Sequence, residues 1–260
     1  MFSLKLSSPH FNQVKWVLVS IIGFTVLSLS ASAQGKVVKN SNQQWIQYYG
    51  HAKIGGKWTV FADGGYRVED NFSKRAQYIA RVAMGYSLNP SISLAAGFAN
   101  SGLYSSAELS KEEFRPYEEL GIHQRVGKMG FSHRFRVEER FFNPVVNHRI
   151  LHPGTFDFRF RYSFMAAIPV INLSKGKPGS RILLDLGDEI FLNAGKNIVY
   201  NYFDQNRIIL SPTLEINPHL SLSLAWNNQF ASTTTAGTYH HTQVMWLQIK
   251  QGFDFSRKKH

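Results

Sequence analysis

The chain has 260 residues, of which 43% are hydrophobic and 18% are charged, and 29 lysines and arginines stand against 17 acids. It contains no cysteine, which excludes disulfide frameworks, thiolate zinc sites and cysteine nucleophiles. A helical multi-span membrane protein is excluded too. Beyond residue 33 the longest apolar run, Phe164 to Ile171, is much shorter than the roughly 18 residues needed to cross a bilayer.

The first 33 residues have the pattern of a secretory signal peptide. Lys5 and Lys15 precede an apolar stretch from Trp16 to Leu29. Ala31-Ser32-Ala33 then offers the small side chains that signal peptidase accepts. An uncleaved membrane anchor is disfavoured, because the stretch is short and no stop-transfer charges follow it. We expect cleavage after Ala33, export to the outer membrane of a Gram-negative bacterium, and a single domain over 34–260.

Beyond residue 33 the dominant pattern is alternation with a period of two, which predicts β-strands. In Thr155 to Ser163, three phenylalanines and a tyrosine occupy one parity, and Asp157, Arg159 and Arg161 occupy the other. An extended strand directs these two sets to opposite faces. Similar alternation predicts strands at 114–126, 133–141, 220–230 and 242–255.

Short and long connections alternate between the predicted strands. Tight turns are expected at Gly55-Gly56, Asn89-Pro90, 127–130 and Asn217-Pro218. Longer loops are expected at 70–74, 101–112, 143–154, 194–202 and 231–238. This asymmetry is typical of outer-membrane barrels, in which one end has tight turns and the other has long loops.

The expected number of strands follows from the alternation pattern and from a general rule for bacterial barrels. About eleven segments can be counted, whereas single-chain bacterial barrels have an even number. We therefore expect ten or twelve strands, with 43–54 as a candidate for a lead-in segment rather than a full strand. The predicted fold is all-β: an antiparallel up-and-down transmembrane β-barrel with a polar, charged lumen.

Membrane barrels and soluble barrels differ in which parity faces the interior. A soluble barrel hides its apolar side chains, whereas a membrane barrel turns them toward lipid and its polar side chains toward the lumen. The export signal, the 14% aromatic content and the long predicted strands favour the membrane barrel. A soluble periplasmic binding barrel is the alternative fold and function.

In the membrane barrel the charged parity lines the lumen. Burying an isolated ion costs several kcal/mol, so the arginines should pair with carboxylates there. The expected lumen ion-pair network consists of Arg134, Arg136, Glu138, Arg140, Asp157, Arg159, Arg161, Asp185, Glu189 and Arg207. It would make the protein a structural barrel or a narrow, porin-like permeation barrel.

The arginine-rich blocks also resemble a known family. These blocks are 133–140, 158–162 followed by Ile168-Pro169, then Asp188-Glu189 and 203–207. In this order they resemble an uncharacterised outer-membrane β-barrel family, domain-of-unknown-function family 2490, from Trp45 to Phe255. The resemblance implies a barrel in the outer membrane and no catalytic or binding residues. Similarity of the final strand to those of outer-membrane proteins implies recognition by the barrel assembly machinery.

A lipid-acting enzyme, of the lipid A deacylase or phospholipase type, is the alternative activity. Such enzymes use Ser and His with a third partner, and the candidates are Ser132, His133, Glu138 and His123. Ser132 and His133 are adjacent on a strand and must point to opposite faces, which argues against a dyad. We therefore lean against an enzyme and assign no catalytic residue.

The remaining charged groups predict partners rather than chemistry. Glu108, Glu112, Glu113 and Asp204 are interpreted as solvated loop charges, and His240-His241 lacks a third metal ligand. We expect no metal, no cofactor and no nucleic-acid partner. Outer-membrane lipids, lipopolysaccharide included, are the expected partners, with their phosphates near Lys111, Arg149, Lys196 and the tail 257–259.

Overall fold

A computed structural model of the chain describes residues 36–106, 108–173 and 179–256. The expected signal peptide and its cleavage site lie outside the described residues. The strands are β1 (Val37–Gly55), β2 (Trp58–Glu69), β3 (Lys74–Asn89), β4 (Ile92–Ser105), β5 (Glu108–Val126), β6 (Met129–Val146), β7 (Arg149–Ile150), β8 (Thr155–Asn172), β9 (Arg181–Ala194), β10 (Phe203–Asn217), β11 (Leu220–Ser232) and β12 (Thr238–Asp254). Among the described residues no helix is long and apolar enough to cross a membrane.

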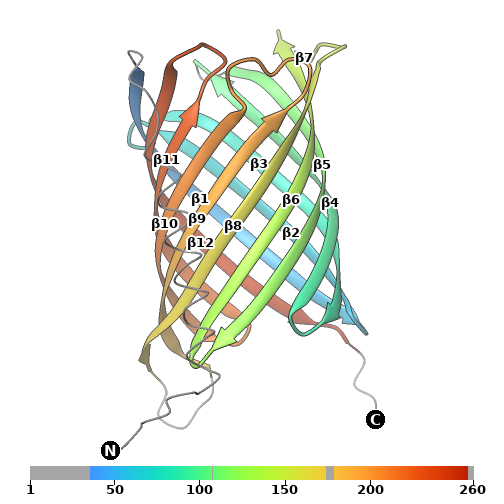
Figure 1. Cartoon of the computed structure of the whole chain (residues 1–260), viewed down its shortest axis with the longest axis vertical. Coiled ribbons are helices and arrows are strands. Elements are labelled where there is room, and N and C mark those ends of the chain that lie inside the picture. The colour runs from blue at the N-terminus through green and yellow to red at the C-terminus, as the bar shows by residue number, and fades with distance from the viewer. Residues whose placement is uncertain (1–35, 107, 174–178, 257–260) are drawn as a thin grey trace, which may run out of the picture. The chain divides into compact units, whose positions relative to one another are not determined.

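Eleven of these strands form one closed barrel (Figure 1). Each barrel strand pairs antiparallel with its neighbours in the chain, β6 pairing directly with β8. The two-residue β7 pairs only with β6 and is not part of the barrel wall. The barrel closes where β1 and β12 run parallel, in register from Val37 opposite Thr238 to Lys53 opposite Asp254.

The expectation of ten or twelve barrel strands is wrong, and the reason is this parallel pair. A barrel of consecutive antiparallel strands can close with an odd number only if its first and last strands are parallel. The segment 43–54 is not a lead-in, because it belongs to the 19-residue strand β1, which is paired along both edges. The direct count of eleven segments agrees with the structure.

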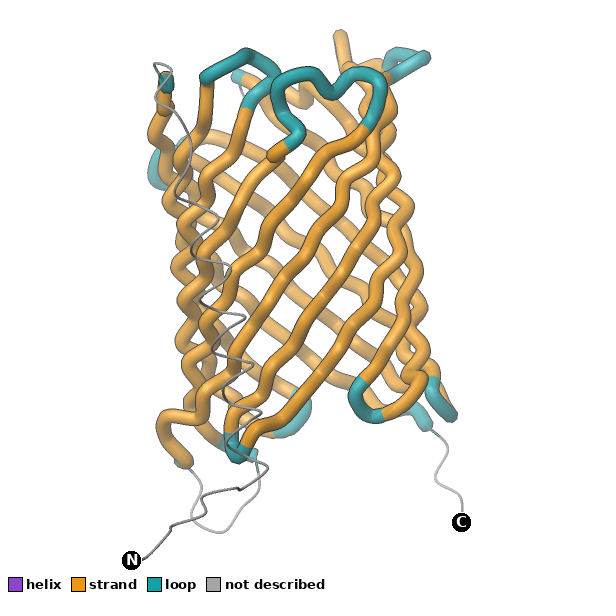
Figure 2. The backbone as a smooth tube through the Cα atoms, viewed as in Figure 1, coloured by secondary structure: helices purple, strands orange, loops and turns teal. Residues whose placement is uncertain are grey.

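The strands are steeply tilted, and their registers show it (Figure 2). From Gln47, successive partners through β2, β3, β4, β5 and β6 lead to Thr155, at the start of β8. In the other direction, through β12, β11, β10 and β9, the partners lead to Pro169 near the end of the same strand. This offset along one strand is the stagger that a closed, tilted barrel requires.

The two ends of the barrel have different connections. At one end, here called the turn end, two-residue turns follow β1 and β5. Gly56 and Gly127 adopt positive φ angles of 56° and 60° there, a conformation that glycine adopts without strain. After β3, the Asn89 side-chain oxygen accepts hydrogen bonds from the backbone N–H groups of Ser91 and Ile92, at 2.8 and 2.9 Å.

The opposite end, here called the loop end, carries the connections after β2, β4, β6, β9 and β11. Four of these five match expected loops to within a few residues. The loop expected at 101–112 is wrong, because β4 continues to Ser105 and β5 begins at Glu108. Ser110 stabilises this extension, since its hydroxyl donates to the Leu103 carbonyl across the strand pair at 3.1 Å.

Apolar side chains cover the outside of the wall, and charged side chains lie inside. On β8, Phe160 is 46% exposed, whereas its neighbours Arg159 and Arg161 are 8% and 7% exposed. On β11, Leu224 is 50% exposed and Asn227 is fully buried. The arrangement is the inverse of a soluble barrel.

Candidate functional site

Glu138 on β6 is the centre of the charged interior. Its carboxylate is fully buried and lies 2.6 Å from Arg159 and 2.6 Å from Arg161, both on β8. Arg115 on β5 lies at 3.4 Å and Arg136 on β6 at 3.7 Å. Register explains the arrangement, because Arg159 is the direct partner of Glu138 across the β6–β8 pair.

Two further carboxylates extend the network toward the two ends of the barrel. Glu113 on β5 binds Arg115 at 2.6 Å and Arg140 at 2.7 Å. Glu189 on β9 lies 2.6 Å from Arg134 and 2.6 Å from Arg161. Each carboxylate therefore serves at least two guanidinium groups, which can share a charge that would be costly to bury alone.

Ion pairs within 4.0 Å join thirteen charged residues into one network. Its seven arginines and six acids are Arg115, Arg134, Arg136, Arg140, Arg159, Arg161, Arg207, Glu113, Glu119, Glu138, Glu189, Asp157 and Asp204. They come from β5, β6, β8, β9 and β10, on one side of the barrel. We call this set the arginine network.

Nine of the ten residues expected in a lumen network belong to the arginine network. Asp185 does not: its carboxylate accepts a hydrogen bond from the Thr213 hydroxyl at 2.7 Å. The other four members are Glu113, Arg115, Glu119 and Asp204, none of which is among the ten expected residues. The interpretation of Glu113 and Asp204 as solvated loop charges is wrong, because Glu113 is 2% exposed on β5 and Asp204 lies on β10, 3.0 Å from Arg159. The alternation of Glu113 with Arg115 and Tyr117 was a usable signal in the sequence.

Aromatic rings inside the barrel support the guanidinium groups. Phe191 on β9 is 1% exposed and lies under three of them, with its ring centroid 4.5 Å from Arg161, 4.6 Å from Arg207 and 5.3 Å from Arg159. Tyr117 lies in the same way 4.2 Å from Arg136. A cation over a ring face is attracted by the ring quadrupole. Neither ring was expected in the lumen from the sequence.

The opposite side of the interior is built differently. Five glutamines line it, and we call it the glutamine side: Gln43, Gln47, Gln77, Gln229 and Gln248. Its Asp63 is fully engaged, bound by Arg81 at 2.8 Å and by the Gln47 amide at 2.7 Å. A cavity of about 1210 Å³ runs between the glutamine side and the arginine network.

Connections at the loop end contribute to the lining of this cavity. The β9–β10 connection places Ile198 in the lining, where the side chain is 7% exposed, and its Asn201 carbonyl accepts a hydrogen bond from Asn193 at 3.0 Å. Lys111, expected near lipid phosphates, also lines the cavity, with its ammonium 5.4 Å from the Phe142 ring centroid.

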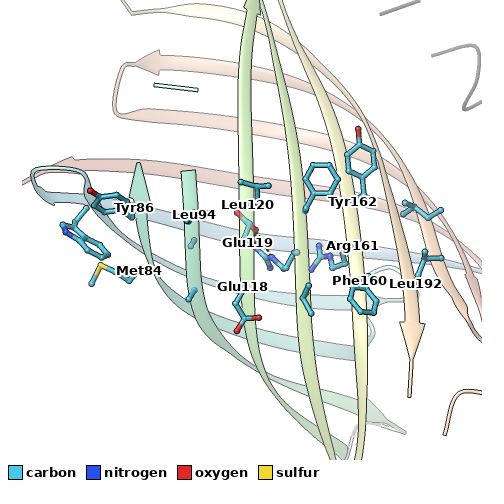
Figure 3. A pocket seen from close by; sticks show the side chains of 17 residues that line it. Met84, Tyr86, Leu94, Glu118, Glu119, Leu120, Phe160, Arg161, Tyr162 and Leu192 are labelled. Atoms are coloured by element: carbon cyan, nitrogen blue, oxygen red, sulfur yellow. Dashed lines mark hydrogen bonds and ion pairs between the residues drawn. The ribbon is translucent and has the colours of Figure 1, made fainter. Parts of the chain in front are cut away.

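A second depression, of about 760 Å³, is lined mostly by apolar residues of β2 to β6, β8 and β9 (Figure 3). Outward side chains such as Met84, Phe160 and Leu192 border it. Glu118 is exposed among them, whereas the adjacent Glu119 accepts hydrogen bonds from Arg136 in the interior. Adjacent positions of β5 thus separate an outer carboxylate from an inner one.

The enzyme candidates do not assemble. Ser132 on β6 is the cross-strand partner of His123 on β5. His133 instead forms a hydrogen bond with the Tyr162 hydroxyl at 2.9 Å. No hydrogen bond joins Ser132 to either histidine among the described residues. Within the same residues, no group of three or more His, Cys, Asp or Glu is placed to hold a metal ion.

Fold and interior together define a closed eleven-stranded β-barrel with an ion-paired lumen. The chain belongs to the family described as protein of unknown function (DUF2490), whose model matches residues 42–240. The match covers β1 to the beginning of β12, including the whole arginine network. No curated protein and no solved structure matches the chain.

Proposed function

We propose that this protein is an outer-membrane β-barrel of a Gram-negative bacterium, whose ion-paired lumen leaves only a narrow path for permeation. The observation that carries the proposal is the inverted wall. Large apolar side chains are exposed on every barrel strand, while five strand arginines are buried: Arg115, Arg136, Arg159, Arg161 and Arg207. Contiguous exposed apolar surface of this extent is uncommon in soluble proteins and is the rule for barrels in lipid.

The same inversion argues against the soluble periplasmic barrel. A soluble protein with this wall would expose Phe98, Phe135, Leu224 and Leu247 to water, and aggregation would be expected. For the lipid-acting enzyme, Ser132 lies across the strand pair from His123, but among the described residues no hydrogen bond joins it to His123 or His133, so no dyad supports this activity. No specific contact favours either alternative.

The proposed location in the outer membrane also implies partners for the protein. Export through a signal peptide cleaved after Ala33 would deliver the chain to the barrel assembly machinery. The final strand, with Phe253 and Phe255 exposed near its end, supplies an aromatic signal of the kind that this machinery recognises. Once folded, the apolar wall would contact outer-membrane lipids, with lipopolysaccharide against the loop end.

Membrane insertion is tested by heat-modifiability. Membrane fractions are run on gels with and without boiling, because a closed barrel resists detergent unfolding until heated. We expect the unboiled protein to sit in the outer-membrane fraction and to migrate differently from the boiled form. Recovery of the folded protein in the soluble periplasmic fraction would contradict the proposal.

The narrow path is tested by conductance in planar bilayers. The intact barrel should give small currents, and Arg136→Ala or Arg159→Ala should each increase the conductance or add gating noise, because each removes a buried cation from Glu138. Arg75→Ala is the matched control, since Arg75 is exposed and lies beside Tyr104, away from the cavity lining. Large, steady porin-like currents from the intact protein would refute the ion-paired lumen as an obstruction.

A further inference from the structure

Arg67 on β2 is an interior arginine outside the arginine network. Its guanidinium donates a hydrogen bond from Nη1 to Gln77 at 2.6 Å, and its Nε is buried without an acceptor. Its Cζ atom lies 3.8 Å from the ring centroid of Trp45. Among the described residues, no carboxylate forms an ion pair with it within 4.0 Å. Since a guanidinium has five N–H donors, most of the donor capacity of Arg67 is unused.

Arg207 on β10 approaches the same ring. Its Cζ atom lies 5.3 Å from the Trp45 centroid, and its Nε donates to Gln229 at 3.0 Å. Its nearest carboxylate oxygen is on Glu189, 3.7 Å from Nη1, which is too long for a hydrogen bond. The other oxygen of Glu189 is already shared by two arginines of the network at 2.6 Å each.

Among the described residues, no ion pair within 4.0 Å joins either arginine to another acid. Asp63, the acid on this side of the barrel, is bound by Arg81 through both oxygens, at 2.8 and 3.0 Å. Arg81 and Lys250 are further cations of the cavity lining, and Asp185, which also lines it, accepts a hydrogen bond from Thr213. Two guanidinium groups therefore lie against one indole ring without a carboxylate at hydrogen-bond distance, in an interior where unpaired charge is costly.

We propose that the lumen binds an oxyanion, the phosphate or carboxylate group of a small solute, at Arg67 and Arg207 beside Trp45. A guanidinium fork matches the geometry of phosphate and carboxylate oxygens and binds them with charge-assisted hydrogen bonds. Both arginines and Trp45 line the 1210 Å³ cavity, which gives a solute access to them. The bound oxyanion would supply the negative charge that no protein carboxylate provides at hydrogen-bond distance from these two arginines.

Trp246 provides a further donor beside the proposed site. Its ring meets Trp45 edge-on, with centroids 5.1 Å apart and an interplanar angle of 71°. Its Nε1 is buried without a hydrogen-bond acceptor. An indole N–H normally finds an acceptor when buried. Trp246 also lines the cavity, so its free N–H is a candidate donor to a bound oxyanion.

A role of this site in permeation rests on the proposed function. Binding of an oxyanion at the site does not depend on that function. Binding can therefore be measured apart from the membrane, on the folded full chain in detergent micelles, by calorimetric titration with inorganic phosphate at constant ionic strength. We expect saturable binding. Arg67→Gln and Arg207→Gln should each weaken it about tenfold or more, because each loses a charge-assisted hydrogen bond.

Arg75→Gln is the matched control: it removes one positive charge outside the lumen and should leave phosphate affinity unchanged. Heat-modifiability verifies that each variant is folded. If Arg67→Gln does not fold, Arg67→Lys replaces it, since it keeps the charge and loses the fork, and its affinity should also fall. Titration with sodium acetate in place of phosphate distinguishes a general oxyanion site from a phosphate site.

The inference is overturned if the intact protein shows no saturable phosphate binding, or if phosphate binds equally well to both lumen variants. Failure of the proposed function has a different signature. A protein that binds phosphate in micelles but neither enters the outer membrane nor conducts would keep the site and lose the permeation path. A conducting barrel without phosphate binding would do the reverse.

Discussion

Glu138 shows most directly how single residues hold the interior together. Four arginines from three strands surround this one carboxylate, and no water-exposed surface remains on it. Breaking a buried ion pair by removing one partner is strongly destabilising, because the remaining charges stay buried and unpaired. The carboxylate therefore acts as a shared counter-ion, whose loss affects β5, β6 and β8 together.

We predict that Glu138→Gln lowers the free energy of unfolding by about 3–5 kcal/mol, since it keeps the size of the side chain and removes its charge. Urea unfolding of the folded barrel in lipid vesicles, followed by tryptophan fluorescence, measures the change. The matched control is Glu139→Gln, the next residue, for which no ion pair is found among the described residues. Equal effects of the two substitutions would contradict the inverted wall.

At the same scale, the sequence predicts most of the lumen chemistry but not its connectivity. Alternation on β6 and β8 is sufficient to place Arg134, Arg136, Arg159 and Arg161 on one face, because strand parity is a local property. Which carboxylate each arginine meets depends on register between strands, which no single segment encodes. Asp185 illustrates this, since its parity is correct and its partner is a threonine.

Among the elements, β1 has the most unusual role, because it closes the barrel in parallel with β12. The expectation of an even number of strands failed here. The alternation along β1 predicts a strand, but nothing within the segment specifies whether the strand beside it runs parallel or antiparallel. The β4–β5 connection failed for a different reason. Its polar composition resembles a loop, although cross-strand contacts such as Ser110 with Leu103 continue the ladder.

The parallel closure can be tested with cysteine pairs, because the chain has no cysteine of its own. Ile46 and Leu247 are register partners, and both are exposed on the outer wall. We expect Ile46→Cys with Leu247→Cys to form a disulfide, since neighbouring strands lie about 4.8 Å apart, within the Cα range of a disulfide. Mass spectrometry of the oxidised protein detects the bond.

Ile46→Cys with Phe253→Cys is the matched control pair. Phe253 is the partner of Ala52, so parallel pairing places it about 20 Å from Ile46 along the strand, beyond disulfide reach. Cross-linking of this control pair, with none in the Ile46 and Leu247 pair, would show that β1 and β12 are not parallel in the stated register.

For the molecule as a whole, an odd strand number places the beginning and the end of the barrel at opposite ends. Val37 begins β1 beside Thr238 at the loop end, whereas β12 finishes at the turn end. A barrel with an even number of strands would have both at the turn end. If the loops face the outside of the cell, as in known outer-membrane barrels, the first residues of β1 face outside as well.

Single cysteines and a membrane-impermeant maleimide on intact cells test this topology. Lys39→Cys, at the start of β1, and Asn71→Cys, in the β2–β3 loop, should be labelled alike, because both lie at the loop end. Lys128→Cys, in the β5–β6 turn, should be labelled only after the cells are broken. Protection of Lys39→Cys together with Lys128→Cys would place the start of β1 at the turn end, which eleven strands with a parallel closure do not allow.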